Sequence, residues 1–153
     1  MTAHLVILHP RWLERLADGR KSVEFRASDQ RRAPWGKAAR GDRLWLKESG
    51  GPVTASASVA DVQYRGPFSE AELSRLLEGL DGDPDDALDA HWRSRLLTAR
   101  YVSLVWTTRV ALLPPIDVRD LRGKRQDSWQ VLTPAEGDLV RSRLNRGWQE
   151  RLS

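Results

Sequence analysis

The chain of 153 residues contains no cysteine. Without thiols it has no disulfide framework, no thiolate zinc site and no thiol nucleophile, and this composition is consistent with an intracellular location. The sequence also lacks a charged leader followed by a long apolar run, and no stretch approaches the length needed to span a bilayer. We therefore predict a soluble, cytoplasmic protein without a membrane partner.

Metal-binding and phosphate-binding motifs are missing as well. The histidines His4, His9 and His91 are scattered, and none has a histidine partner at i, i+4, so we predict no metal site. In the acidic run from Asp81 to Asp89, the glycine and the terminal glutamate of a calcium loop do not fall at the positions that such a loop needs. There is no glycine-rich phosphate loop, nucleophile elbow or dinucleotide-binding turn. We predict no cofactor.

Charge is divided unevenly along the chain, whose formal net charge is +4. Residues 1–50 hold 11 basic and 6 acidic residues, residues 61–95 hold 4 and 9, and residues 96–153 hold 10 and 6. A fold that brings the two basic ends together would form a positive face suited to phosphate. The alternative is that these arginines form only a solvated surface.

Hydrophobic periodicity and capping signals predict alternating strands and helices within one domain. The expected strands cover residues 5–8, 22–26, 43–47, 54–62 and 101–112. The expected helices cover residues 10–18, 69–79 and 85–95, with a last one after residue 133. Capping boxes open two of these helices, at Ser69 and at Thr133. Pro114 and Pro115 are expected to end the longest strand.

The most informative stretch is Gly-Arg-Lys-Ser-Val-Glu-Phe-Arg, from Gly19 to Arg26. Gly19 is placed to close a short helix, and the strand that follows sends Glu24 and Arg26 to the same face. Lys21, at the entrance of that strand, can swing toward them. This density of charge predicts a site, although Glu24 and Arg26 pairing with each other on an exposed strand face is the simpler interpretation.

The order Gly-x-Lys-x-x-Glu-x-Arg, then a loop, then Gly41-Asp42 before a strand, resembles the ASCH family of the PUA-like superfamily. The resemblance extends from Leu5 to about Leu112. It implies an α+β fold with a small PUA-like β-barrel flanked by α-helices, and a cleft beside the motif that takes RNA or a nucleotide. We predict a single ASCH/PUA-like domain over residues 1–153, in which 114–153 form a C-terminal extension packed on the barrel.

The seven tryptophans divide by their surroundings. Trp12, Trp45 and Trp106 lie among apolar residues, which indicates core packing. Trp35 and Trp129 follow basic segments, where an aromatic ring beside arginines is suited to stacking on a base while its phosphates are neutralised. Capping one end of a barrel is the alternative for each of the two, and for Trp129 it is an equal one.

The resulting prediction is a binding domain for RNA, another single-stranded nucleic acid or a nucleoside. Lys21, Glu24 and Arg26 line the expected cleft, with Glu24 accepting hydrogen bonds from exocyclic amines and the two cations meeting phosphates or carbonyls. The further candidates for nucleic-acid contact are Trp35, Arg40, Arg125, Ser128 and Trp129. The sequence predicts no particular oligomeric state.

The alternative is a hydrolase of the same family, either a ribonuclease or an amidohydrolase acting on a modified nucleoside such as acetylcytidine. Lys21 would then be the base or charge stabiliser, and Glu24 a general acid or base. A ribonuclease could also use a divalent metal, with Ser128 or Tyr101 assisting. The amidohydrolases that this chain resembles place a nucleophilic threonine where Glu24 stands, and a carboxylate does not replace that hydroxyl.

Overall fold

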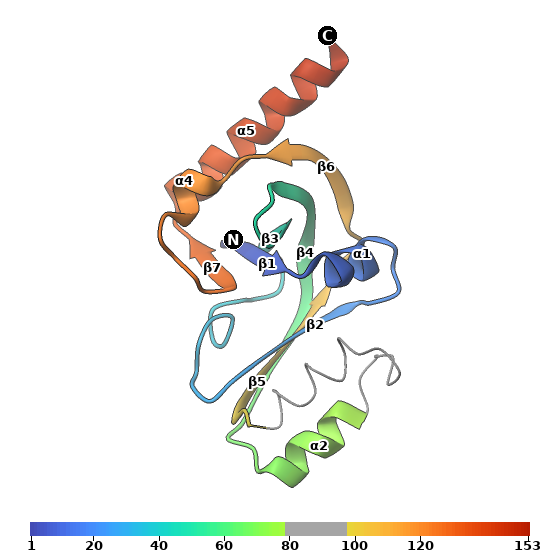
Figure 1. The fold of residues 1–153 in the computed structure, drawn as a ribbon, viewed down its shortest axis with the longest axis vertical. Coiled ribbons are helices and arrows are strands. Elements are labelled where there is room, and N and C mark those ends of the chain that lie inside the picture. The colour runs from blue at the N-terminus through green and yellow to red at the C-terminus, as the bar shows by residue number, and fades with distance from the viewer. Residues whose placement is uncertain (79–97) are drawn as a thin grey trace.

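The computed structural model describes residues 1–78 and 98–153 of a mixed α+β chain, as the sequence predicted (Figure 1). The strands are β1 (Ala3–Leu8), β2 (Val23–Ser28), β3 (Arg43–Glu48), β4 (Val53–Arg65), β5 (Tyr101–Thr107), β6 (Ala111–Ile116) and β7 (Trp129–Leu132). The helices are α1 (Pro10–Ala17), α2 (Glu70–Glu78), α4 (Arg119–Arg122) and α5 (Pro134–Leu152). The acidic run from Asp81 to Asp89 and the helix predicted over 85–95 lie outside the described residues. No helix within the described ranges is long and apolar enough to cross a membrane.

The strands form one seven-stranded sheet in the order β2-β5-β4-β3-β1-β7, and β6 pairs with β4 off this path. The long strand β4 is shared, because its first half pairs with β3 and β6 while its second half pairs with β5. The sheet is not closed into a barrel, so that prediction was wrong. The strands β2 and β7 end the order, and among the described strands no backbone pairing joins them.

Local sequence signals account for both ends of α1 and for the start of α5. The side chain of His9 accepts a hydrogen bond from the backbone N–H of Arg11 at the first turn of α1. Gly19 follows the helix with a φ of 81°, in the left-handed region that glycine tolerates. The predicted capping box of α5 is confirmed, since Thr133 and Glu136 each accept from the backbone N–H of the other.

The predicted strand over 101–112 is divided into β5 and β6, and at the break Thr108 is hydrogen-bonded to Ser58 of β4. The backbone N–H of Thr108 donates to the carbonyl of Ser58, and the N–H of Ser58 donates to Oγ1 of Thr108, both at 2.9 Å. We expected Pro114 and Pro115 to end the strand, but β6 runs through both. They are tolerated because β6 pairs with β4 alone and needs no donor on its other side.

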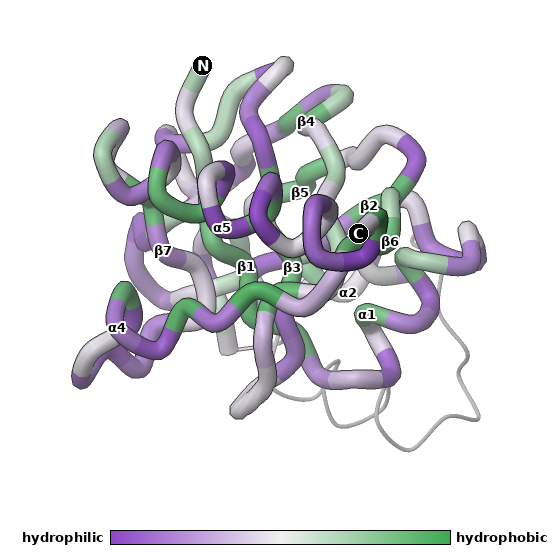
Figure 2. The backbone as a smooth tube through the Cα atoms, turned by 90° about the horizontal axis from the view of Figure 1, so that it is seen from above, coloured by the Kyte–Doolittle hydropathy of each residue, from purple (hydrophilic) through white to green (hydrophobic). Residues whose placement is uncertain are grey.

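Three groups of buried apolar side chains form the core. One lies between β1, β3 and α1, the second packs under α5, and the third packs under α2. Trp45 is buried in the second group, as predicted, whereas Trp12 and Trp106 are only partly buried against the other two. In Figure 2, apolar positions lie along β1 inside the molecule, and polar positions are frequent along α5.

Residues 114–153 hold the end of β6 together with α4, β7 and α5. Their strand β7 pairs antiparallel with β1, and α5 covers the second core group through Val140 and Leu144. In Figure 1 the C-terminal end of α5 extends beyond the sheet. This region therefore contributes both a strand and a covering helix to the sheet that begins with residue 3.

Candidate functional site

Three charged side chains from the Gly19–Arg26 stretch meet at the start of β2. Oε2 of Glu24 lies 3.3 Å from Nζ of Lys21, and Oε1 of Glu24 accepts from Nε of Arg26 at 3.0 Å. These side chains are 14, 7 and 12% exposed for Lys21, Glu24 and Arg26. Glu24 and Arg26 therefore pair as strand alternation predicted, but inside the protein rather than on an exposed face.

Lys21 is also held from the side of α1. Its Nζ lies 4.5 Å from the centre of the Trp12 ring, within the range of a cation–π contact. Trp12 thus supports the ammonium group in addition to packing against the core. The ammonium group lies between an aromatic ring and a carboxylate, which fixes it close to Glu24.

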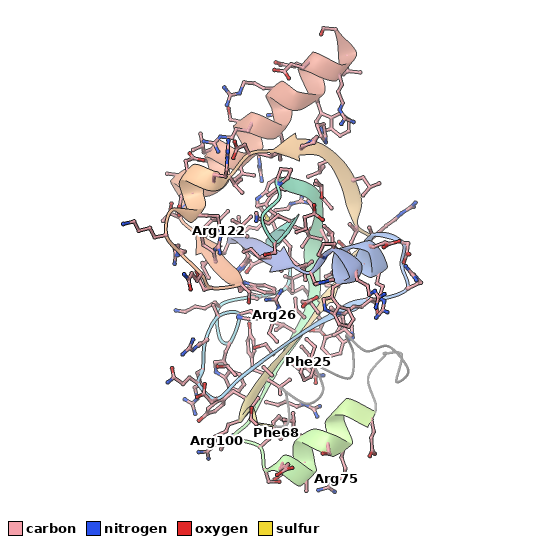
Figure 3. All side chains as sticks on the ribbon, in the orientation of Figure 1. Phe25, Arg26, Phe68, Arg75, Arg100 and Arg122 are labelled. Atoms are coloured by element: carbon pink, nitrogen blue, oxygen red, sulfur yellow. The ribbon has the colours of Figure 1, made fainter. Side chains whose placement is uncertain are left out.

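Arg26 spans the open side of the sheet. Its Nη1 donates to Oγ of Ser128 at 2.6 Å and to the carbonyl of the same residue at 3.2 Å. Its Nη2 donates to the carbonyl of Ile7 at 2.9 Å. The guanidinium carbon lies 5.5 Å from the centre of the Trp129 ring. Figure 3 shows Arg26 near the middle of the molecule, between β2 and the strands β1 and β7.

A cleft of about 630 Å³ lies beside Arg26. The lining residues are Arg26, Ala27, Ser28, Gln30, Arg32, Ala33, Trp35, Tyr101, Ser103, Gln126, Asp127, Ser128 and Trp129. They come from both ends of the strand order, from β5, and from the loops before β3 and β7. The cleft therefore occupies the opening that an unclosed sheet leaves.

The structure brings four of the predicted contact residues together on this cleft: Arg26, Trp35, Ser128 and Trp129. The other four do not line it. Lys21 and Glu24 lie behind Arg26, while the exposed side chains of Arg40 and Arg125 pair with nearby aspartates. Arg40 is 76% exposed and lies 3.5 Å from Asp61.

The wall formed by Trp35 is aromatic and well supported. The ring centre of Trp35 lies 5.3 Å from that of Tyr101 and 5.4 Å from that of Tyr64. The guanidinium of Arg31 lies 5.3 Å from the Tyr101 ring. Burial raises the pKa of Tyr64, whose hydroxyl donates to the carbonyl of Ala38. The phenol therefore stays protonated at neutral pH and holds the loop that carries Trp35.

The floor formed by Trp129 rests on a buried polar chain. Trp129 is only 3% exposed, and its Nε1 donates to Nδ1 of His4 at 3.0 Å. The other ring nitrogen of His4 lies 2.9 Å from Oδ2 of Asp42. Burial by itself would raise the pKa of Asp42, but hydrogen bonds from His4 and from the backbone N–H groups of Thr2 and Ala39 outweigh it and hold that pKa below its usual value. Asp42 is therefore a carboxylate at neutral pH.

Sequence reasoning missed much of the polar lining and the partners of Trp129. Ser103 could have been found, because strand pairing places it opposite Arg26 in the antiparallel pair of β2 and β5. His4 also carried a signal, because it shares one face of the first strand with Val6 and Leu8, which are buried. Within residues 1–78 and 98–153, no group of three or more histidine, aspartate or glutamate side chains is placed to hold a metal ion.

Comparison with known proteins identifies the family. The family model of the ASCH domain matches residues 6–104. No curated protein matches the sequence. Among solved structures, ASCH from Zymomonas mobilis is 18% identical with a TM-score of 0.65, covering 92% of this chain and 94% of that chain.

Two further solved structures share the fold at lower identity. A hypothetical protein from Leishmania major is 13% identical with a TM-score of 0.54, covering 99% of this chain and 97% of that chain. The N-terminal domain of McrB from Thermococcus gammatolerans, solved bound to m5C DNA, is 10% identical with a TM-score of 0.51, covering 95% and 98%. At such identities the likeness concerns the fold, whereas the family follows from the match over residues 6–104. The chain belongs to the ASCH domain family.

Proposed function

We propose that this ASCH domain binds single-stranded nucleic acid, with RNA as the first candidate, and takes one unpaired nucleotide into the cleft between β2 and β7. The observation that carries the proposal is a cleft of about 630 Å³ with guanidinium groups and an aromatic wall in one lining. That volume is in the range of small-molecule sites. The McrB domain of similar fold, solved with m5C DNA, supports nucleic acid as the class of ligand.

The charged part of the lining is suited to phosphate. Arg32 is exposed at the cleft, and the hydroxyl of Ser128 lies against the guanidinium of Arg26. Within the described residues Nη2 of Arg26 donates to the carbonyl of Ile7 and to no other acceptor, which leaves its second N–H available as a donor for a ligand oxygen if the ligand reaches Arg26 in the cleft. Guanidinium groups match phosphate oxygens in charge and in the spacing of their donors.

The opposite part of the lining is suited to a base. Trp35 and Tyr101 offer ring faces and edges, and stacking on aromatic side chains is the usual way in which unpaired bases are held. Ser103 and Gln126 add polar groups that can pair with the edge of a base. The sequence alone predicted that Lys21 and Glu24 contact the ligand. We assign them instead to positioning Arg26, because Glu24 pairs with both Lys21 and Arg26.

The hydrolase alternative requires Lys21 and Glu24 to reach a substrate. In this structure both side chains are paired, and neither lines the cleft. We therefore prefer binding without cleavage, and treat ribonuclease or amidohydrolase activity as an outcome that the same experiment detects.

The test is fluorescence anisotropy with an end-labelled single-stranded RNA, the matching single-stranded DNA and the matching duplex. We expect the single strands to bind best and the affinity to fall between about 50 and 200 mM salt, because phosphate contacts release counterions. Arg32→Ala should weaken binding, while Arg151→Ala, on the exposed end of α5, should not. The absence of salt-sensitive binding to any of these probes would contradict the proposal.

The same samples, run on denaturing gels with and without magnesium, report cleavage. We expect intact RNA. Cleavage that disappears in Lys21→Ala would instead make the protein a ribonuclease with Lys21 in its machinery.

A further inference from the structure

We propose that His4 and Asp42 are positioning residues of the cleft, which fix the orientation of Trp129 and, through it, the guanidinium of Arg26. Neither residue lines the cleft, and neither belongs to the Gly-x-Lys-x-x-Glu-x-Arg motif. The inference rests on the proposed binding function, because it gives these two residues a role in holding the binding surface. The chain of contacts runs from Asp42 to His4, then to Trp129, and then to Arg26.

The direction of each hydrogen bond in this chain is determined by chemistry. The indole N–H of Trp129 can only donate, so Nδ1 of His4 must be an unprotonated acceptor. The proton of the neutral ring therefore resides on Nε2, where it faces the carboxylate of Asp42 at 2.9 Å. A carboxylate only accepts hydrogen bonds. Moving the proton of His4 from Nε2 to Nδ1 would therefore place two donors opposite each other at Trp129 and two acceptors opposite each other at Asp42.

The anchor of the chain is fixed to the backbone. Gly41 has a φ of 90°, which lets the chain turn sharply just before β3 and places Asp42 beside the first strand. Oδ1 of Asp42 accepts from the N–H of Thr2, and Oδ2 also accepts from the N–H of Ala39, both at 3.0 Å. The carboxylate cannot rotate without breaking these bonds. Asp42 thus holds His4 in one tautomer and one orientation.

Burial makes the chain hard to replace with water. His4, Asp42 and Trp129 are all buried, and a buried donor or acceptor that loses its partner retains the whole cost of desolvation. The rings of His4 and Trp129 meet edge to face at 5.7 Å, so the histidine also limits the tilt of the indole. The ring of Trp129 is held both by its N–H group and by its neighbour's ring.

The contact between Trp129 and Arg26 connects the fixed orientation of the indole to the binding surface. The guanidinium of Arg26 lies 5.5 Å from the centre of the Trp129 ring, and Arg26 also binds Ser128, the residue that precedes Trp129. A tilt of the indole therefore disturbs the ring face under Arg26 and the backbone that Arg26 grips. We infer that loss of the His4 acceptor misplaces Arg26 without removing any group that touches the ligand.

The experiment compares His4→Leu with His4→Asn. Leucine fills the space but accepts no hydrogen bond, whereas the amide oxygen of asparagine stands near the position of Nδ1 and restores an acceptor for Trp129. NMR of the isotope-labelled free protein reports the indole N–H of Trp129 and the Nε–H of Arg26, and anisotropy with the labelled single-stranded RNA reports affinity. We expect His4→Leu to shift both resonances and to weaken binding at least tenfold, and His4→Asn to recover most of both effects.

Trp129→Phe removes the same hydrogen bond from the other side and replaces His4→Leu if that variant fails to fold. We expect the double variant of His4→Leu and Trp129→Phe to bind RNA with the affinity of whichever single variant binds less tightly, because both changes break the same hydrogen bond. Additive losses would overturn the inference, as would a His4→Leu protein that keeps the Arg26 resonance and the affinity unchanged. If the wild-type protein does not bind RNA at all, the proposed function fails, while the resonances of the free protein still decide the positioning role.

Discussion

Two clefts formed by the described residues are of nearly equal size but differ in how their charges are held. The cleft between β2 and β7 measures about 630 Å³, and a second, of about 620 Å³, lies where β6, α4 and α5 meet. The lining of the second cleft consists of Pro115, Ile116, Asp117, Arg119, Asp120, Arg143, Arg146, Gly147 and Glu150. Volume therefore does not distinguish the two.

Two of the three arginines that line the second cleft, Arg119 and Arg143, are paired with exposed carboxylates. Arg143 donates to both oxygens of Asp120 and to the carbonyl of Asp117, and Arg119 donates to both oxygens of Asp117. In the first cleft Arg26 has a buried carboxylate behind it and an aromatic ring beneath it. The first cleft is therefore the better candidate to bind a ligand. What distinguishes it is its aromatic ring faces and its buried ion pair, not its size.

The largest expected effect is the difference between Arg26→Ala and Arg143→Ala in the free energy of unfolding. Removing Arg26 leaves Glu24 buried with Lys21 alone and breaks the bonds to Ile7 and Ser128, so we expect the free energy of unfolding to fall by about 3 kcal/mol. Arg143→Ala should lower it far less, because its partner Asp120 is 58% exposed. Urea unfolding measures both, and equal losses would refute the contrast between the clefts.

The next effect concerns the aromatic wall. Trp35→Ala should weaken binding of single-stranded RNA about tenfold, since stacking on one aromatic side chain contributes about 1–3 kcal/mol per base. Trp148→Ala is the matched control, because Trp148 is 40% exposed on α5 next to Gly147, which lines the second cleft. Anisotropy compares the two variants. A loss of similar size in Trp148→Ala would transfer the binding site to the second cleft.

A smaller effect is expected on two aspartates whose pKa values are both low. Arg119 lowers the pKa of the exposed Asp117 to about 2, and buried hydrogen bonds keep the pKa of Asp42 below its usual value. Each carboxylate stabilises the fold above the unfolded pKa of about 3.9, and that contribution is lost as the pH falls through the lowered value. At about 1 M salt we expect the pKa of Asp117 to rise while that of Asp42 stays low, because screening acts on exposed pairs. NMR titration of the two carboxyl groups measures this, and an equal response of both would contradict it.

The smallest effect is expected from Arg40 and Arg125, the two exposed arginines among the further candidates for nucleic-acid contact. Arg40→Ala and Arg125→Ala should each weaken RNA binding only a few-fold and reduce the salt slope by about one, as loss of a single phosphate contact does. Neither should change the unfolding midpoint measurably, since both side chains are exposed. A tenfold loss in either variant would extend the binding surface beyond the cleft.

The sequence predicted local relationships well because strand and helix periodicity determine them. Alternation along β2 was enough to place Glu24 beside Arg26, and the capping box fixed the start of α5 at Thr133. It failed where two distant segments decide the outcome. The strand predicted over 101–112 is interrupted where Thr108 exchanges hydrogen bonds with Ser58 of β4, and nothing in either residue alone predicts this contact.

The sequence named several residues of the candidate site, but it did not predict how they are arranged in space. Arg26 and Ser128 were both singled out, but their contact joins residues 102 positions apart and depends on how the sheet curves. Lys21 and Glu24 were predicted to contact a ligand because of their charge density and because the family resemblance implies a cleft beside the motif. In the structure both side chains are largely buried and do not line the cleft, and the burial of Lys21 depends on Trp12 of α1, which lies outside the motif.

The bridge made by Arg26 has a mechanical consequence. Separating any two neighbouring strands of the sheet breaks a ladder of backbone hydrogen bonds, whereas within the described residues β2 is joined to Ile7 of β1 and to Ser128, just before β7, by the hydrogen bonds of the Arg26 guanidinium. We therefore expect this boundary to yield first under load. A pulling experiment that draws β2 away from β7 should open the protein there at low force, with the remaining ladders intact.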